Sequence, residues 1–333
     1  MRIALIKTGA LGDVVRTTAL LPGLRRLDPH LDLTWITAPA ALELVRHHPD
    51  VARAVAINDP ADATWRRDRY DWLLSLDDDA EACQLAARLS AARLSGSFET
   101  PQGDRRYTAD IEPWFGMGIL RPAEQGGLER ANALKKQNTK TVGTILYESL
   151  GLPFPVAAPH TALADSHREA AGRCADNLGL TRQMPLVGMN TGAGSRWRFK
   201  SWGEDQTAEL ARRIHDELGA GVLILGGAAE SERNQRIVAT ASRPRVVAAP
   251  TNLELLAFAA LIDLCGVLVT SDSLALHLGN ALGKPVIAFF GPTSGAEIDM
   301  YDLGEKIVTP LECRCCYLKT CDIRPHCMQS IGV

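Results

Sequence analysis

The chain has 333 residues, of which 46% are hydrophobic and 23% charged, and its formal net charge is −3. This composition excludes a disordered chain, and the slight negative charge argues against a partner that is a nucleic acid. The length favours two domains, and no apolar run approaches the ~20 residues of a membrane-spanning helix. The first residues lack the pattern of a signal peptide, so we expect a cytoplasmic protein.

Short apolar runs alternate with helical patterns through the first part of the chain. Residues 2–7 (RIALIK) predict a buried strand, and residues 13–29 predict a helix that is bent or divided at Pro22. Further strands are expected at 31–39, 51–57 and 71–77. Strands that alternate with helices predict parallel βαβ units.

Two segments interrupt this alternation. Residues 97–144 contain aromatic residues, glycine pairs and a basic run, which are typical either of a binding loop or of a plain surface excursion. The stretch around 155–159 is rich in Pro and Ala and has no periodicity, which predicts a linker. We therefore expect one domain at 1–157 and a second at 158–333.

A second α/β series follows the linker. Its expected strands are PLVGMN, GVLILGG, RVVAAP, GVLVTSD and PVIAFFG, and each ends at a turn that passes towards a helix. The predicted fold class is therefore α/β, with two Rossmann-like domains facing each other across a cleft. Ligands of such sheets bind at the carboxyl ends of the strands, where the turns are.

The first strand-end turn is KTGALGD, residues 7–13. Gly9 and Gly12 allow a tight loop, and Asp13 stands where a helix begins. Asp13 could cap that helix, or it could be a catalytic carboxylate. The turn has neither the G-x-G-x-x-G spacing of dinucleotide-binding proteins nor the G-K-[ST] ending of a P-loop.

The second turn begins at NTGAGSRWRFK, residues 190–200. Thr191, Gly192 and Ser195 offer hydroxyl and backbone N–H donors to a phosphate, and three cations follow, ending at Lys200. Such donors suit a diphosphate whose negative charge grows as it leaves. The alternative is a solvated basic loop.

Two more turns place polar residues at strand ends. Glu230 follows GVLILGG and suits a ribose diol or the dipole of a helix. Asp272 and Ser273 follow another strand. His277 shares a helical face with apolar residues, so by spacing alone it is either a core histidine or part of the site.

Four segments in this order resemble the ADP-heptose:lipopolysaccharide heptosyltransferases of glycosyltransferase family 9. They are IKTGALGDVVRTTALLPGLR, NTGAGSRWRFKSWGED, LILGGAAE and TSDSLALHLGNALGKPVIAFFGPT. The resemblance covers nearly the whole chain and implies an inverting glycosyltransferase with the GT-B fold. The implied donor domain is the C-terminal one, and the implied acceptor domain is the N-terminal one.

The resemblance also implies a role for each matching residue. Asp13 would be the general base, and Lys200 would stabilise the departing diphosphate. Thr191 and Gly192, with Lys200, would bind the diphosphate, Glu230 the ribose, and Thr251 the adenine through its backbone. Asp272, Ser273 and His277 match the D-[ST]-G-x-x-H motif near the donor sugar, with Leu274 at the position of the family's Gly.

We expect no catalytic metal, because no D-x-D pair stands at an obvious strand end. The three acids of LDDDAE, residues 76–81, are predicted to lead from a strand into a helix. Five cysteines crowd the end of the chain, and four of them have the spacing C-x2-C-x4-C-x5-C. Cys313, Cys316, Cys321 and Cys327 could hold a structural Zn or Fe ion, or remain reduced thiols, or form disulfides on purification.

The function implied is transfer of heptose from ADP-heptose to a lipopolysaccharide inner-core sugar. The basic segment 105–140 would bind an anionic glycolipid acceptor, with the protein peripheral to the inner membrane. Three alternatives stay open: a protein or small-molecule acceptor, a GT-B-like nucleotide-sugar epimerase or hydrolase, and a protein that only binds nucleotide sugars.

Overall fold

The computed structural model describes residues 1–59, 63–121, 123, 126–180, 184–194, 199–318 and 320–333. The chain divides into two compact units. Unit 1 is Met1–Ala162 with Ala296–Asp299, and unit 2 is Leu163–Gly295 with Met300–Val333. One division was expected after residue 157. That residues 296–299 belong to unit 1 was not expected.

Unit 1 contains a six-stranded sheet of order β3-β2-β1-β4-β5-β6. The strands are β1 (Arg2–Ile6), β2 (Asp32–Thr37), β3 (Arg53–Ala56), β4 (Arg69–Ser75), β5 (Ser90–Glu99) and β6 (Arg105–Tyr107). All neighbours are parallel except β5 and β6. β1 lies inside the sheet, and Ile3 to Ile6 are fully buried. Such a strand is apolar on both sides because helices cover both faces of a parallel sheet.

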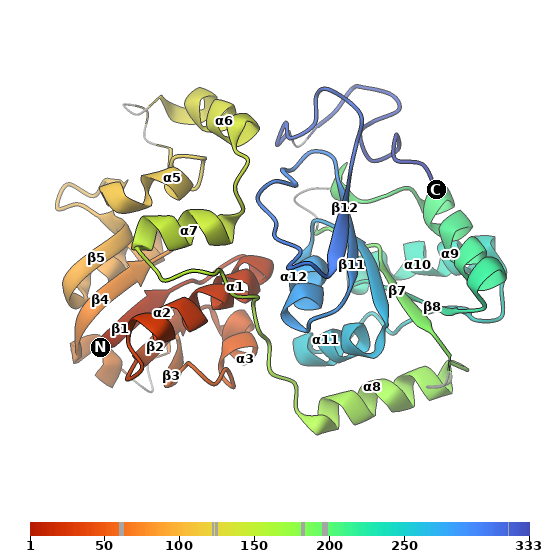
Figure 1. Cartoon of the computed structure of the whole chain (residues 1–333), viewed down its shortest axis with the longest axis horizontal. Helices are drawn as coiled ribbons and strands as arrows, with labels where there is room; N and C mark the ends of the chain where they lie inside the picture. Colours follow the sequence, from red (N-terminus) through yellow and green to blue (C-terminus); the bar gives the residue numbers. More distant parts are fainter. Residues whose placement is uncertain (60–62, 122, 124–125, 181–183, 195–198, 319) are drawn as a thin grey trace. The chain divides into compact units, whose positions relative to one another are not determined.

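The first helices of unit 1 connect these strands, and three more in the described part of the chain follow β6 (Figure 1). They are α1 (Leu11–Thr17), α2 (Leu21–Leu27), α3 (Leu42–Val45), α4 (Ala80–Arg88), α5 (Glu112–Phe115), α6 (Gly127–Gln137) and α7 (Val142–Leu150). The helix expected at 13–29 is divided: α1 passes through the 3-10 turn η1 (Thr18–Leu20) into α2, which has Pro22 in its first turn. Proline is tolerated there because no N–H bond is lost.

A close contact holds α2 and η1 against α7. Tyr147 donates a hydrogen bond from its hydroxyl to the carbonyl of Ala19, at 2.8 Å. A Cβ atom at Gly23 would meet the Tyr147 ring at 2.8 Å, so only glycine fits this approach. The two elements that follow the helix of Asp13 are therefore packed tightly against α7.

Unit 2 contains a parallel six-stranded sheet of order β12-β11-β10-β7-β8-β9. The strands are β7 (Leu186–Asn190), β8 (Gly221–Leu225), β9 (Val246–Ala248), β10 (Val267–Ser271), β11 (Val286–Phe290) and β12 (Gly304–Val308). The helices are α8 (Asp165–Asn177), α9 (Glu204–Leu218), α10 (Ser231–Ala241), α11 (Leu255–Leu264) and α12 (Leu274–Ala281). Figure 1 shows α9 and α10 on one side of this sheet and α8, α11 and α12 on the other.

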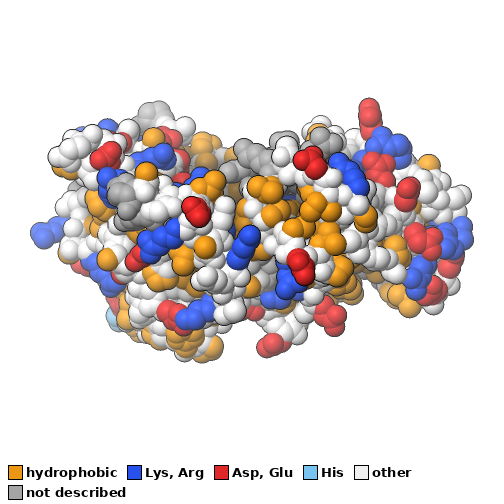
Figure 2. Space-filling view, turned by 90° about the horizontal axis from the view of Figure 1, so that it is seen from above, with side chains coloured by type: hydrophobic (Ala, Val, Ile, Leu, Met, Phe, Trp, Pro, Cys, Tyr) orange, Lys and Arg blue, Asp and Glu red, His pale blue; other side chains and the backbone are white. Residues whose placement is uncertain are grey.

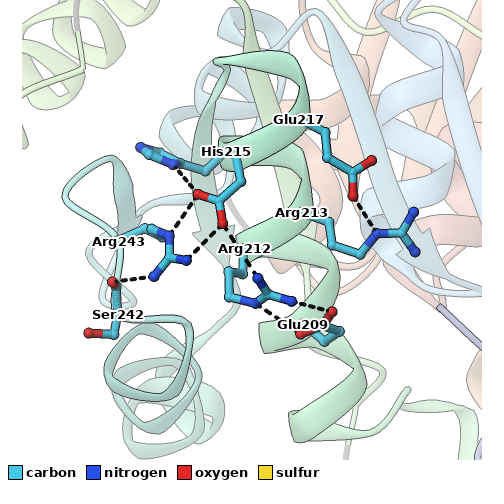
Figure 3. Close-up of polar contacts among 8 residues, drawn as sticks. Glu209, Arg212, Arg213, His215, Glu217, Ser242 and Arg243 are labelled. Carbon is cyan, nitrogen blue, oxygen red and sulfur yellow. Dashed lines mark hydrogen bonds and ion pairs between the residues drawn. The ribbon is translucent and has the colours of Figure 1, made fainter.

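An ion-pair network ties the end of α9 to the turn after α10 (Figure 3). The Asp216 carboxylate accepts two hydrogen bonds from Arg243, each 2.7 Å long, and one from His215 Nδ1 at 3.0 Å. These bonds, with that from Arg243 first, hold the pKa of Asp216 well below its usual range. The network supports the fold and lies outside the predicted site residues.

Candidate active site

The loop after β1 is organised by a buried ion pair. The Lys7 ammonium lies 2.6 Å from the Asp77 carboxylate, and the two side chains are 8% and 12% exposed. Asp77 also accepts hydrogen bonds from the Thr8 hydroxyl at 2.8 Å, the Gly9 N–H at 3.1 Å and the Thr8 N–H. β4, which precedes Asp77, is the parallel neighbour of β1. The end of one strand therefore fixes the loop at the end of the next.

The three acids after β4 each have a different position. Asp77 binds the β1 loop, whereas Asp79 is the N-cap of α4 and accepts a hydrogen bond from the Ala82 N–H at 2.9 Å. Between them, burial and the neighbouring Asp77 charge raise the pKa of Asp78. The expected passage from a strand into a helix is confirmed, since β4 ends at Ser75 and α4 begins at Ala80.

Asp13 lies in the first turn of α1. The helix begins at Leu11 with Ala10 as its N-cap, so the alternative that Asp13 is the capping residue is wrong. The Asp13 carboxylate instead forms an ion pair with Arg16, one turn along, at 2.9 Å. The Arg16 guanidinium in turn lies over the ring of Trp114, 5.2 Å from its centroid. A carboxylate thus stands beside the carboxyl end of the central strand of unit 1, which is the end of such a sheet where ligands usually bind.

In unit 2 the turn after β7 is fixed by Asn190, which sequence reasoning did not select. Its side-chain amide donates hydrogen bonds to the Gly192 carbonyl at 2.8 Å, the Thr270 hydroxyl at 3.0 Å and the Ser273 hydroxyl at 3.1 Å. β7 and β10 are the neighbours between which the strand order reverses, which is the usual ligand position in such sheets. In the sequence, the only indication of a role for Asn190 was its position as the first residue of NTGAG.

Thr191 and Gly192 contact different parts of this edge. The Thr191 hydroxyl donates to the side-chain oxygen of Asn234 at 2.6 Å, so it faces the interior. Gly192 lies against Glu230: a Cβ atom there would meet a Glu230 carboxylate oxygen at 3.1 Å. Glu230 accepts a hydrogen bond from the Gly227 N–H at 2.9 Å. The structure therefore brings Gly192 and Glu230 together, as neighbours at the ends of β7 and β8.

Lys200 and Asp272 form a largely buried ion pair at this edge. The Lys200 ammonium lies 2.7 Å from the Asp272 carboxylate and 3.1 Å from its backbone carbonyl, and the side chains are 13% and 16% exposed. Burial favours the neutral acid, but the Lys200 and His277 charges outweigh it and lower the pKa of Asp272 to about 2. His277 is buried on α12 and acts electrostatically on Asp272, so these three predicted residues lie together.

The remaining predicted residues have simpler positions. The Ser273 hydroxyl is within 3.0 Å of the Thr270 hydroxyl, and Thr251 follows β9 at the sheet's edge. Leu274 is the first residue of α12, a helical backbone that needs no glycine. Ser195 lies outside the described residues.

The C-terminal cysteines are free thiols, and their segment contacts the turn after β11. The N–H groups of Cys315 and Tyr317 donate to the carbonyls of Gly291 and Pro292, at 2.9 and 2.8 Å. Burial, followed by the neighbouring thiols of Cys316, Cys321 and Cys313, raises the pKa of Cys327 to about 11. Across the described part of the chain, no group of three or more His, Cys, Asp and Glu side chains is arranged to hold a metal ion.

Two Rossmann-like units with polar residues at the carboxyl ends of their strands are the architecture of the GT-B fold. Residues 129–326 match the family model of glycosyltransferase family 9 (heptosyltransferase), and the chain belongs to this family. The expected fold class and the resemblance are thereby confirmed.

Three relatives show the extent of the similarity. The chain is 25% identical to lipopolysaccharide heptosyltransferase 1 of Pseudomonas aeruginosa, over 98% of this chain and 88% of that protein. The structure of a family 9 glycosyltransferase from Veillonella parvula has a TM-score of 0.73 at 21% identity, over 92% of this chain and 85% of that one. E. coli heptosyltransferase WaaC with ADP-2-deoxy-2-fluoro heptose has a TM-score of 0.60 at 20% identity, over 93% and 94%.

Proposed function

We propose that this enzyme transfers heptose from ADP-heptose to a sugar hydroxyl of the lipopolysaccharide inner core, with inversion and without a catalytic metal. The observation that carries the proposal is the buried Lys200–Asp272 pair at the reversal point of strand order in unit 2. It holds a cation where a diphosphate would bind. The names of the P. aeruginosa relative and of the WaaC complex support the acceptor and donor classes.

In the proposed reaction the acceptor oxygen attacks the anomeric carbon of the heptose. The new C–O bond forms as the bond to the diphosphate breaks, and its electron pair leaves with ADP. Asp13 takes the proton of the acceptor hydroxyl. Lys200 stabilises the charge that grows on the diphosphate, which is the role a metal ion has in other transferases. Unit 1 would bind the acceptor and unit 2 the donor.

The donor contacts follow from the positions in unit 2. Glu230 would accept hydrogen bonds from the ribose diol, and the backbone around Gly192 would approach the diphosphate. Thr251 would contact the adenine through its backbone. Asp272 would hold Lys200, with Ser273 and His277 beside the donor sugar. Both donors of Thr191 are used inside the fold, the hydroxyl by Asn234 and the N–H by the Leu225 carbonyl at 3.0 Å, so Thr191 would support the turn while Gly192 approaches the ligand.

The acceptor would be an anionic glycolipid bound near segment 105–140. β6 and α6 carry cations in this segment, and Leu128 on α6 is 55% exposed, which suits a peripheral contact with the inner membrane. No helix in the described ranges is long and apolar enough to cross a bilayer. On the face drawn in Figure 2, Lys and Arg side chains are interspersed with Asp and Glu.

The four cysteines gather without forming a coordination set, so a structural Zn or Fe ion at Cys313, Cys316, Cys321 and Cys327 stays a prediction. Such an ion would brace the tail against the loop after β11. No step of the proposed reaction passes through it.

Calorimetry with ADP, UDP and GDP tests the donor site. We expect ADP to bind most tightly and Lys200→Ala to weaken its binding about 10- to 100-fold, as loss of a charged hydrogen bond predicts. Lys284→Ala is the matched control, because Lys284 forms a partly buried pair with Asp263 at 3.2 Å in the same unit. Preference for UDP, or equal effects of the two variants, would contradict the proposal.

Product analysis separates the alternatives. Release of ADP and free heptose without an acceptor would indicate a hydrolase, and a changed sugar that stays on the nucleotide would indicate an epimerase. Transfer to a protein or a small molecule, but not to the inner core, would keep the donor and replace the acceptor. Binding of ADP-heptose with no turnover would leave a nucleotide-sugar binding protein.

A further inference from the structure

The proposed base of this enzyme is paired with a cation in the structure. Arg16 contacts the Asp13 carboxylate at 2.9 Å, and their side chains are 19% and 35% exposed. Both residues stand on α1, one helical turn apart, so the pair reaches the surface beside the carboxyl end of β1.

An ion pair between Asp13 and Arg16 opposes base catalysis by Asp13, unless Arg16 changes to another anionic partner. A guanidinium beside a carboxylate stabilises the charged form, so a carboxylate that keeps this partner takes up a proton less readily. It also occupies Oδ1, one of the two oxygens that an acceptor hydroxyl could use. For Asp13 to act on an acceptor, Arg16 requires another anion.

Arg16 is held in a position that suits such an exchange. Its guanidinium lies over the ring of Trp114, 5.2 Å from the ring centroid. Trp114 is buried on α5. Stacking of this kind holds the planar group by its face, whereas its N–H donors point outward from its edge. The arginine can therefore keep its place on the ring while its anionic partner changes.

We infer that Arg16 is an acceptor-binding residue: an anionic group of the acceptor, carboxylate or phosphate, takes the guanidinium from Asp13 and leaves Asp13 ready to accept the proton. Arg16 thereby couples recognition of an acidic acceptor to activation of the base. This inference rests on the proposed function, since it takes Asp13 as the base and a sugar hydroxyl as the nucleophile.

The first test varies the acceptor on the wild-type enzyme. Three acceptors are compared at saturating ADP-heptose: deacylated inner-core oligosaccharide, the same material with its carboxyl groups converted to amides, and the same material treated with phosphatase. We expect one of the two neutralised acceptors to raise KM about 10- to 100-fold, because a bidentate bond from arginine to an anion is lost. That acceptor identifies which anion binds.

The second test combines the acceptors with Arg16→Gln. With the intact acceptor we expect KM to rise about 10- to 100-fold and kcat at saturation to stay within about threefold. With the acceptor that lacks the identified anion, wild type and variant should have the same KM, because the two changes remove one interaction. Arg46→Gln is the matched control, since Arg46 pairs with Glu43 at the same helical spacing on α3 and its adjoining turn.

Other outcomes would overturn the inference. Equal KM of the wild type for all three acceptors would show that no acceptor anion is recognised, and this result does not depend on any variant folding. A fall of kcat in Arg16→Gln that is the same for all acceptors would show that Arg16 only positions Asp13. If the wild type transfers heptose to none of them, the proposed function itself fails, and the inference with it.

Discussion

The Lys7 ammonium and the Asp77 carboxylate lie 2.6 Å apart and almost completely buried, at the ends of the neighbouring strands β1 and β4. The same carboxylate binds the backbone of Thr8 and Gly9, so one side chain determines the course of the loop that leads to Asp13. The position of the proposed base thus depends on a residue 64 places further along the chain.

Removing Asp77 should destabilise unit 1 and lower activity. We expect Asp77→Ala to reduce the free energy of unfolding by about 3 kcal/mol, because it leaves the Lys7 charge buried and unpaired. Hydrogen exchange of β1 peptides in urea would measure this for unit 1 alone. The double variant Lys7→Met/Asp77→Leu should recover much of the stability. It should not recover the activity, because the N–H groups of Thr8 and Gly9 still lack the carboxylate that accepts their hydrogen bonds.

The control for this experiment is Glu112→Ala, which breaks an exposed pair with Arg130 at 3.0 Å. Its effect should stay below about 0.5 kcal/mol, as for other exposed pairs. An Asp77→Ala protein with normal stability and normal kcat would show that the buried pair does not organise the loop.

Asp13→Asn should abolish transfer and leave donor binding intact. The amide cannot take the proton of the acceptor hydroxyl, so we expect kcat to fall at least about 100-fold. The Kd for ADP should stay within about twofold, because the donor contacts are proposed in unit 2. Radiolabelled heptose transfer and calorimetry measure the two effects on one preparation, and transfer at the wild-type rate would exclude Asp13 as the base.

The low pKa of Asp272 predicts how the stability of unit 2 depends on pH. Because folding lowers this pKa from 3.8 to about 2, the charged form stabilises the folded state above pH 3.8. The stabilisation is lost as the pH falls through about 2. At pH 7 it amounts to about 2 kcal/mol by the free energy of the shift.

Asp272→Asn should therefore reduce the free energy of unfolding of unit 2 by about 2 kcal/mol at pH 7, and the difference from wild type should shrink below about pH 4. Hydrogen exchange of β10 peptides measures it. Asp263→Asn, which breaks pairs with Arg168 and Lys284, is the comparison. A difference that grows as the pH falls would have the wrong sign for this mechanism.

The C-terminal thiols should differ in reactivity. Cys327 is buried and its pKa is raised to about 11, whereas Cys313 is exposed. Since the thiolate is the nucleophile, we expect iodoacetamide at pH 8 to modify Cys313 at least about tenfold faster than Cys327. Mass spectrometry of the peptides gives both rates. Equal protection of all four cysteines, together with one Zn or Fe per chain by elemental analysis, would instead show a metal site.

The sequence by itself determined the α/β class, most of the parallel strands, and the strand ends that carry polar residues. These properties are local: a buried strand is a run of apolar residues, and a strand end is the turn that follows it. β5 was missed because its sequence, SAARLSGSFE, has no continuous apolar run. Its buried residues are Ser95, Gly96 and Ser97, and the two serine hydroxyls are accommodated by hydrogen bonds with Trp72, Asp110 and Ser75.

Only the tertiary structure decided how those residues are paired. Lys200 meets Asp272, Gly192 meets Glu230, and Asn190 joins two strand ends, although each set is separated by tens of residues in the sequence. The structure also placed Trp114 against Arg16, the helical neighbour of Asp13. Hydrogen bonds and ion pairs depend on distances of about 3 Å between groups brought together by folding, and burial then sets their strength and pKa. Local spacing contains neither quantity.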